Sequence, residues 1–575
     1  MKKISFIGFI FLFVFSAING QQHKTPYELS GNKATTTYEE CREWYRNLHQ
    51  QFPDITFFDS IGTSDGGFPM YTFRIYTGEN VQALRVLVMN NIHPGEPEGT
   101  DASMILVRNL LENPKKYREI LQNIDLNILC QYNADGTKNR GCCRRANQDG
   151  PDFKGNRANA KNLDLNRDFI KMDSRNAKYF SRYFIKNKFQ VFIDNHTSNG
   201  ADYQYTLTYF HTRPEKLNPL LVPFMEEMTT GIEKKLHKRK IPTAPYVETI
   251  SHVPDSGIVA FWETGRYSTG YASLHHCIGF TVETHMLKPF SDRVNVTLAF
   301  MEELLDVIAD KKQIEKIQHT YREIYGEDKL RTTLMVPNRW VLDKSRHDEI
   351  PFLGYEFGYK TSAISGSKRL YYDKNKPWER NIPYYHYYKP ADSVLVPRAY
   401  IVPQQWGEII DRLLWNGIKM KQIPRDTNLM LRASYIQSYE TVKNPYESHY
   451  MHYNTTSWDT LMGVDLHAGD YLIQVTNTNR SFLVAVLEAR SPDSYFNWNF
   501  FDGILQQKEG FSDYVFEEQA MEILNKNPEL KLRFEEKQKS DSTFASSPWA
   551  QLNWIYLHSE FFEPVYNRVP VYRMD

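Results

Sequence analysis

The segment that decides the fold spans residues 85–96 and reads RVLVMNNIHPGE. Residues 85–89 form a short apolar run bounded by polar loops, which predicts a buried strand ending at Met89. Residues 99–112 follow with apolar side chains at helical spacing. The segment is therefore expected to turn from a strand into a helix. Open α/β sheets build their functional sites at such strand ends, and His93 and Glu96 stand at this one.

Strand and helix signals alternate in the same way over residues 23–320. This order predicts an α/β domain with a mixed or parallel central sheet flanked by helices. Further strands are expected at 126–130, 189–193 and 277–282, and helices at 37–51, 174–186, 214–238 and 292–311.

A second strand end supplies a third metal-type side chain. The pair His93 and Glu96 can meet on one ion because Pro94-Gly95 between them permits a sharp turn. The strand at 189–193 runs into His196, with Asp194 close by as a partner that could orient it. Two histidines and one glutamate, with one position left open, are the pattern of a hydrolytic zinc site.

A candidate general base stands at a third strand end. The apolar run 277–282 leads directly into Glu283. A carboxylate beside a metal-activated water can accept a proton and deliver it again. Three strand ends that each carry a ligand or a base are much less expected by chance than any one of them.

Basic residues lie between these strand ends, at Arg144-Arg145 and at Asn166-Arg167. Arginine suits the bidentate binding of a substrate carboxylate because its guanidinium is planar and permanently charged. A developing oxyanion also needs a positive donor beside the metal.

Taken in order, these motifs resemble the zinc metallocarboxypeptidases of the M14 type. The resemblance covers roughly residues 23–320 and rests on an ordered set of short motifs rather than on one of them. The set is His93-Pro94-Gly95-Glu96, Asn133-Ala134-Asp135-Gly136, Arg144-Arg145-Ala146-Asn147, Asp164-Leu165-Asn166-Arg167, His196 and Thr281-Val282-Glu283-Thr284.

The resemblance implies a role for each matched residue. One zinc ion would be bound by His93, Glu96 and His196, and Glu283 would act as general base and proton shuttle. The scissile carbonyl would be polarised by Arg145, with Arg144 as the alternative because the alignment there is ambiguous. The C-terminal carboxylate of a peptide would be held by Asn166 and Arg167.

The chain departs from the family pattern at a few positions. Ala134 replaces a proline in the turn, and Asp168 follows Arg167 where the family commonly has asparagine. That acid is expected to pair with Arg167 and weaken its grip on a carboxylate. The mobile tyrosine that caps the substrate is fixed by no motif, and Tyr267 and Tyr271 are the candidates.

Residues 330–575 are expected to form a second, mixed α+β domain of unknown role. Short strand-like runs, prolines and aromatics dominate there, with strand signals at 369–372 and 382–385. A helix is predicted at 406–415 and a strand pair at 470–475 and 481–487. No chemistry is assigned to this domain, and packing or substrate restriction is favoured over an independent activity.

The N-terminus resembles an export signal. Lys2 and Lys3 precede an apolar run, and small residues at 16–20 offer a cleavage site before Gln21. Residues 1–20 are therefore expected to be a signal peptide of a secreted or periplasmic protein, with no membrane span after its removal. The five cysteines are no disulfide scaffold, and the balance of 69 acidic and 69 basic residues calls for no nucleic-acid partner.

The sequence thus predicts a secreted zinc carboxypeptidase that acts on peptides. One alternative keeps the site but changes the substrate, as a zinc amidase or deacylase for cell-wall peptides or acylated amino acids. Another is an inactive peptide-binding protein on the same fold, which the intact ligands and base oppose. The oligomeric state is left open.

Overall fold

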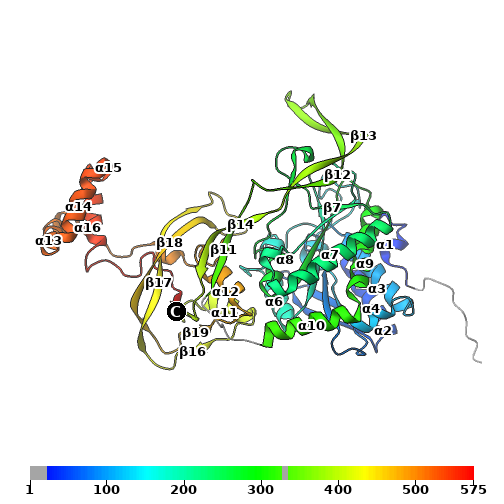
Figure 1. Ribbon diagram of the computed structural model, residues 1–575, viewed down its shortest axis with the longest axis horizontal. Coiled ribbons are helices and arrows are strands. Elements are labelled where there is room, and N and C mark those ends of the chain that lie inside the picture. Colours follow the sequence, from blue (N-terminus) through cyan, green and yellow to red (C-terminus); the bar gives the residue numbers. More distant parts are fainter. Residues whose placement is uncertain (1–22, 327–333) are drawn as a thin grey trace, which may run out of the picture.

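The computed structural model describes residues 23–326 and 334–575 (Figure 1). The expected signal peptide, residues 1–20, lies outside the described residues. In the described part of the chain, no helix combines the length and the apolar character needed to cross a bilayer.

The first body is built on an eight-stranded mixed sheet in the order β1-β2-β4-β3-β5-β10-β6-β7. Its centre is parallel, with β4, β3, β5 and β10 side by side, and antiparallel pairs flank it. This architecture confirms the predicted α/β fold. The strands are β1 (Thr56–Thr63), β2 (Pro69–Ile75), β3 (Leu84–Met89), β4 (Ile124–Leu129), β5 (Val191–Ser198), β6 (Leu207–His211), β7 (Thr243–Pro245) and β10 (Ile278–His285).

Both faces of the sheet are covered, which explains the continuous apolar run in β3. Val86 and Val88 belong to one core cluster, whereas Leu87 and Met89 belong to the other. Successive strand residues point to opposite faces, so a strand buried on both sides must be apolar throughout. The first cluster is contributed by α2 (Tyr38–Gln51), α3 (Glu98–Glu112), α4 (Arg118–Asn123), α7 (Val222–Lys238), α9 (Phe290–Ile308) and α10 (Lys311–Gly326); the second lies against α6 (Arg175–Asn187) and α8 (Ser268–Leu274).

One long helix predicted in this body is broken. Residues 214–238 form the short turns η2 (Pro214–Lys216) and η3 (Pro219–Leu221) before α7 begins. Pro219 lacks an N–H and pushes Asn218 into an extended conformation, with ψ 128°. The expected helix 292–311 is likewise divided between α9 and α10. Short helices at α1 (Pro26–Leu29), α5 (Ala134–Lys138), η1 (Leu165–Arg167) and η4 (Pro254–Ser256) complete the body.

A long β-ribbon from beyond residue 330 joins this first body. Strands β12 (Asp348–Thr361) and β13 (Lys368–Tyr385) pair with each other, and β13 also pairs with β9 (Ile258–Val259), which pairs with β8 (Glu248–Thr249). The two runs predicted as separate strands at 369–372 and 382–385 both lie in β13. The ribbon projects away from the body at the top of Figure 1.

The second body is centred on a six-stranded sheet in the order β16-β19-β15-β20-β17-β18. The predicted helix near 406–415 is present as α11 (Gly407–Trp415), and the strand near 470–475 as β19 (Tyr471–Gln474). The remaining elements are β15 (Ala399–Val402), β16 (Lys421–Gln422), β17 (Thr427–Thr441), β18 (His452–Leu466), β20 (Tyr572–Met574), η5 (Asp502–Leu505) and the separate pair β11 (Met335–Leu342) and β14 (Tyr388–Leu395).

Residues 481–487 are not the predicted strand. They lie in a helix, α12 (Arg480–Leu487), with Phe482, Leu483, Val484, Val486 and Leu487 all buried. A short apolar run suits a buried strand and a buried helix equally well, so periodicity could not distinguish them. Together with α11, this helix contributes to the core cluster that also covers one face of the eight-stranded sheet.

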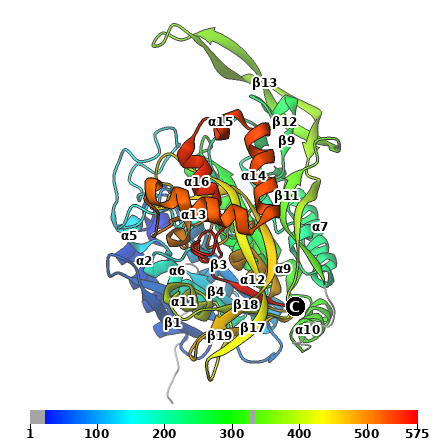
Figure 2. The same cartoon turned by 90° about the vertical axis from the view of Figure 1, so that its left-hand side faces the viewer.

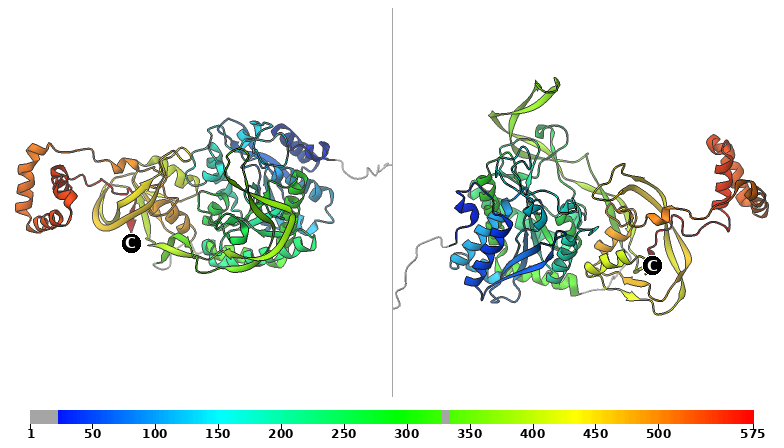
Figure 3. Two further views of the ribbon diagram at one scale, coloured as in Figure 1. Left: turned by 90° about the horizontal axis from the view of Figure 1, so that it is seen from above. Right: turned by 180° about the vertical axis from the view of Figure 1, so that it is seen from behind.

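A helical module stands apart from both bodies. It comprises α13 (Asp513–Lys526), α14 (Pro528–Ser540), α15 (Ser542–Ala545) and α16 (Pro548–Leu557). Figures 1 and 3 show it projecting from the second body, and Figure 2 looks onto it end-on. Its helices pack around a cluster of their own that includes Phe516, Leu552 and Tyr556. The predicted mixed α+β domain at 330–575 includes no such module.

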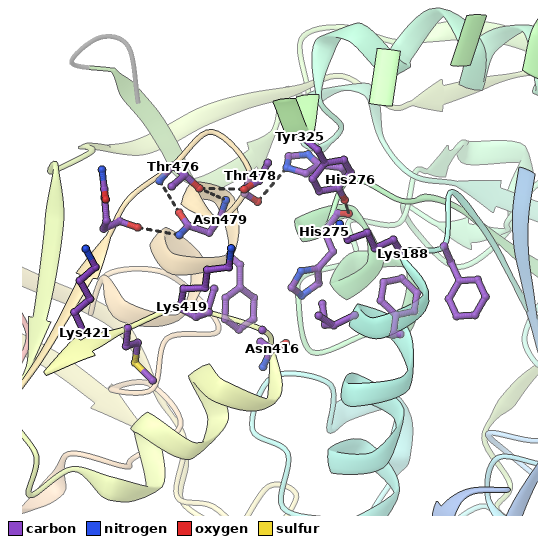
Figure 4. A pocket seen from close by; sticks show the side chains of 18 of the residues that line it. Lys188, His275, His276, Tyr325, Asn416, Lys419, Lys421, Thr476, Thr478 and Asn479 are labelled. Atoms are coloured by element: carbon purple, nitrogen blue, oxygen red, sulfur yellow. Dashed lines mark hydrogen bonds between the residues drawn. The ribbon is translucent and has the colours of Figure 1, made fainter. Parts of the chain in front are cut away.

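A cavity of about 590 Å³ lies where the two bodies meet (Figure 4). The His275 ring lies 5.1 Å from Phe482 of α12, and His276 Nε2 is 3.1 Å from the Thr478 carbonyl oxygen. Burial lowers the pKa of His275 to about 3 and that of His276 to about 4, so both rings are neutral. The cavity is lined from both bodies and adjoins the amino-terminal end of β10.

Candidate active site

Three expected metal ligands converge at the carboxyl edge of the central strands. His93 and Glu96 occupy the turn between β3 and α3, which is closed by a bond from the Glu96 N–H to the His93 carbonyl. His196 lies within β5, which extends beyond the strand predicted at 189–193. One donor atom from each of the three buried side chains lies within 4.8 Å of the others.

The histidine rings are oriented for a shared cation. Nδ1 of each ring is 3.3 Å from an oxygen of Glu96. On the far side, His93 Nε2 contacts Asp164 at 2.9 Å, and His196 Nε2 contacts Asp194 at 2.7 Å. His93 Nδ1 is buried without a hydrogen-bond partner among the described residues. A donor set of two imidazole nitrogens and a carboxylate, each ring fixed by an aspartate, fits zinc.

Glu96 remains ionised in spite of its burial. Burial alone would raise the pKa of its carboxyl, but Arg145 and the two histidines lower it well below the usual range. The guanidinium of Arg145 contacts Glu96 directly and also donates to the Thr197 carbonyl oxygen at 2.7 Å. The carboxylate is therefore available as an anionic ligand.

Glu283 lies beside the metal ligands on the neighbouring strand. In the parallel pair of β10 and β5, Glu283 is in register with His196. Burial raises the pKa of the Glu283 carboxyl, Glu96 and Asp194 raise it further, and His196 and Arg145 lower it. Glu283 lines the same pocket as His93, Glu96 and His196. A carboxyl in this position can take up and release a proton next to the metal site.

The basic residues predicted from the sequence separate into two groups. Arg145, Asn166 and Arg167 line the pocket, whereas Arg144 turns away and donates to Asn139 Oδ1 at 3.1 Å. Arg144 is thus not brought to the site. Its neighbour Arg145 adopts a left-handed backbone conformation, with φ 53°, which turns the two successive side chains in different directions.

Sequence reasoning missed a further arginine. Arg157 lines the pocket and donates to Asp164 Oδ2 at 3.0 Å and to Glu96 Oε1 at 3.4 Å. It lies in an irregular loop with no strand end to mark it. The available signal was its position nine residues before Asn166, between the two basic motifs that were singled out.

Asn166 and Arg167 are held in place by neighbouring elements. Asn166 Oδ1 accepts from the N–H of Ser268 at 3.0 Å, at the beginning of α8. Arg167 lies over the Tyr267 ring at 4.4 Å, and its Nε donates to the Tyr446 hydroxyl of the second body at 3.1 Å.

The expected pairing of Asp168 with Arg167 is wrong. Asp168 is fully buried and binds Lys171 Nζ at 2.8 Å and the N–H of Ser174 at 3.0 Å. It thus anchors the beginning of α6, and its side chain points away from the pocket. The carboxylate nearest to Arg167 is instead that of Asp164, at 4.0 Å.

Only one of the two tyrosine candidates lies at the pocket. Tyr267 lines the pocket, whereas Tyr271 is fully buried and donates its hydroxyl hydrogen to Asn416 Oδ1 at 2.7 Å. The structure therefore does not bring Tyr271 to the site. Helix α8 begins between them, and a helix that starts at Ser268 directs residue 271 into the core between the two bodies.

The pocket has a volume of about 520 Å³ and further walls that the sequence did not predict. Aromatic side chains line it on one side, together with a buried carboxylate, Glu263, and Thr281 of β10. The aromatic residues are Phe210, Tyr246, Phe261 and Tyr267.

Known proteins resemble this chain to different extents. Residues 41–199 match the family model described as zinc carboxypeptidase. Carboxypeptidase 2 of Trichophyton tonsurans is 23% identical over 529 residues, covering 84% of this chain and 89% of the fungal protein. Carboxypeptidase E of Caenorhabditis elegans is 26% identical over 169 residues, covering 26% of this chain and 35% of that protein. The crystal structure of carboxypeptidase A from Helicoverpa armigera has a TM-score of 0.37 at 13% identity, over 48% of this chain and 74% of that one. The similarity to the fungal protein extends well beyond the residues that the family model matches.

Proposed function

We propose that this chain, which carries a zinc carboxypeptidase domain of the M14 family and is a metallocarboxypeptidase, releases single residues from the free C-termini of peptides. We propose that it does so outside the cytoplasm. The observation that carries the proposal is the convergence of His93, Glu96 and His196 beside Glu283 in one pocket that also holds Arg167. The pairing of a metal site with a fixed carboxylate anchor suits an exopeptidase better than an enzyme for internal bonds.

We propose that His93, Glu96 and His196 hold one zinc ion. When bound, zinc polarises the scissile carbonyl and lowers the pKa of a water molecule at the site. Asp164 and Asp194 fix the two imidazole rings so that Nδ1 of each faces Glu96 and would be the nitrogen that holds the ion. The zinc content of the purified protein should be lost in His196→Ala and kept in His237→Ala, which alters an exposed helix residue.

Glu283 is the proposed base. Its carboxylate takes a proton from the attacking water and returns it to the leaving amine, and its burial beside Glu96 favours proton uptake. Arg145 and Arg157 carry the two guanidinium groups that contact Glu96, so both are placed to donate to the oxygen that becomes negative. Asn166 and Arg167 bind the C-terminal carboxylate of the peptide.

Mass spectrometry of a mixed peptide set tests this proposal, with Glu283→Gln as the matched inactive variant. The expected result is loss of single C-terminal residues, absent in the variant and absent for C-terminally amidated peptides. If zinc-loaded protein leaves every free peptide intact, the exopeptidase is rejected. Cell-wall fragments and acylated amino acids then become the substrates to examine.

Export is the remaining part of the proposal. The sequence Lys2-Lys3 followed by an apolar run supports cleavage before Gln21. N-terminal sequencing of protein recovered from the medium or the periplasm should begin at Gln21. Recovery of the full-length chain from the cytoplasm would contradict it.

A further inference from the structure

Three lysines border the cavity that lies between the two bodies. Lys188 belongs to the first body, and Lys419 and Lys421 belong to the second and lie opposite it (Figure 4). No aspartate or glutamate of the described chain lines this cavity, and none of the three ammonium groups forms an ion pair or a hydrogen bond with a described residue. Lys188 lies over the ring of Tyr325, at 5.1 Å. Because a hollow lined by one sign of charge attracts the opposite sign, the cavity favours an anion.

The other titratable groups at this cavity bring no negative charge. Burial lowers the pKa of His275 to about 3 and that of His276 to about 4, so both rings are neutral. The bond to the Thr478 carbonyl opposes the shift of the His276 pKa, and the positive charge of Arg480 adds to it. The described residues therefore do not supply the negative charge that would balance the lysines, and a ligand has to bring it.

The buried part of the cavity wall is apolar. Phe184, Phe189, Ile418 and Phe482 line it, and all four are buried members of the core that the two bodies share. The three lysines are exposed, so their charged ends lie on the solvent side of this wall. The cavity therefore offers an apolar surface and a positive rim to the same molecule.

We propose that this cavity binds a small amphipathic carboxylic acid, with its carboxylate held at the lysine rim and its acyl or aromatic body packed on the apolar wall. The volume of about 590 Å³ falls within the range of about 300–1,000 Å³ that is usual for small-molecule sites. A bare inorganic anion would leave the apolar wall uncontacted, and an uncharged apolar molecule would leave the lysines unpaired. The ligand contacts both bodies, so its binding stabilises the folded arrangement of the two.

Calorimetry of the zinc-loaded protein with sodium octanoate tests the inference. The wild type should bind one octanoate with a Kd on the order of 100 µM, and octan-1-ol at least about tenfold more weakly. Lys188→Gln combined with Lys419→Gln should weaken octanoate binding at least about tenfold and remove its advantage over the alcohol. Lys186→Gln combined with Lys443→Gln is the matched control, because it removes two exposed lysines that lie outside the cavity, and it should bind octanoate as the wild type does. 4-Phenylbutyrate in the same series distinguishes an aromatic body from an acyl chain, and binding of either acid in this pattern supports the site.

Three results would overturn it. Equal octanoate affinity in the wild type and the cavity variant, or octan-1-ol binding as tight as that of octanoate, would mean that the lysines hold no carboxylate. Sulfate binding as tight as that of octanoate would mean that the apolar wall takes no part. Lack of saturable binding by both acids would reject the site altogether. All these measurements report binding and need no turnover, so they stand apart from the proposed carboxypeptidase function.

Discussion

At the two histidines of the proposed metal site, each ring uses one nitrogen to face Glu96 and the other to contact an aspartate. Asp194 accepts from Ser268 Oγ at 2.5 Å as well as contacting His196, so its carboxylate is fixed from two directions. Such partners set the tautomer and the basicity of a ligating imidazole. The strength of metal binding should therefore depend on residues that never touch the ion.

Asp194→Asn is expected to weaken zinc affinity by about 10- to 100-fold while the fold is retained. The amide keeps the shape of the carboxylate but removes the negative charge that supports His196. Competition with a chromophoric chelator measures the affinity, and Asp59→Asn at an exposed strand position serves as the control. Unchanged zinc affinity in Asp194→Asn would show that the aspartate only fills space.

The residues at strand ends were predictable, and those in loops were not. Each of the four residues His93, Glu96, His196 and Glu283 comes shortly after an apolar run, so the pattern of the chain itself places them at one sheet edge. Arg157 lies in an irregular loop, and its approach to Glu96 depends on how that loop folds. The direction of Arg144 and of Asp168 depends on local backbone angles and on the beginning of α6, which residue spacing does not reveal.

At the scale of elements, the connection between β17 and β18 links the second body to the active site. Tyr446 accepts from Arg167 Nε at 3.1 Å, and Glu447 accepts from the N–H of Asp164 at 2.8 Å. The Tyr446 ring also stacks against Trp498, at 6.0 Å. The second body therefore supports the residue proposed to anchor the substrate carboxylate.

Tyr446→Phe should raise KM about fivefold, with kcat within twofold of wild type. The substitution removes one hydrogen bond to Arg167, worth about 1 kcal/mol, while the ring stays on Trp498. Steady-state kinetics on a peptide with a free C-terminus measures both constants. Tyr450→Phe, an exposed position in the same connection, should behave as wild type. A fall in kcat at unchanged KM would argue against a positioning role.

The same connection carries a pH-dependent contact. His449 Nε2 lies 2.8 Å from Asp173 Oδ2, and its Nδ1 lies 2.5 Å from Asn499 Oδ1, so both ring nitrogens face oxygens. Burial lowers the pKa of His449, but the Asp173 carboxylate outweighs it and raises the pKa overall. A pKa raised by folding stabilises the protein fully below the unfolded value of about 6.5, and this contribution is lost as pH rises through the folded value.

His449→Gln should therefore lower the free energy of unfolding by about 1–3 kcal/mol between about pH 5 and pH 6.5. The difference from wild type should shrink as the pH rises above that range. Denaturant melts at several pH values test this, with His467→Gln, a surface position 3.8 Å from Asp426, as the control with no such trend. A difference that stays constant with pH would mean that the imidazole is neutral throughout.

Element types were predictable where periodicity was strong. The helix predicted at 37–51 is α2, capped by Thr37, and the run at 85–89 lies in β3. Predictions failed where one sequence pattern suits two kinds of secondary structure. Residues 482–487 are an apolar run that is buried in a helix, although a run of this length suits a buried strand equally well.

On the scale of the whole molecule, the two bodies share one core. A single cluster contains Leu87 and Phe192 of the eight-stranded sheet together with Leu413, Phe482 and Trp498 of the second body. The α/β fold of the first body could be anticipated from alternating signals. The shared core could not, because it depends on contacts between residues more than 200 positions apart.

The helical module is not part of this shared core. Its chain leaves the second body and rejoins it through residues that lie close together. The N–H groups of Lys508 and Glu509 donate to the Glu563 carboxylate at 2.7 and 2.6 Å. Removal of residues 510–561, with a short Gly-Ser link, should leave zinc content unchanged and kcat/KM within about twofold. Kinetics and circular dichroism check this, and Phe482→Asp in the shared core is the contrast, expected to prevent folding.

A projecting module of this kind is a convenient position at which to attach a label or a solid support. Because both ends of the segment meet at Glu563, a fluorescent domain or a biotinylated tag could replace the helices without separating the two parts of the chain that flank them. Attached to a bead through that point, the enzyme would be held by a segment that contributes no residue to the active-site pocket or to the core shared by the two bodies.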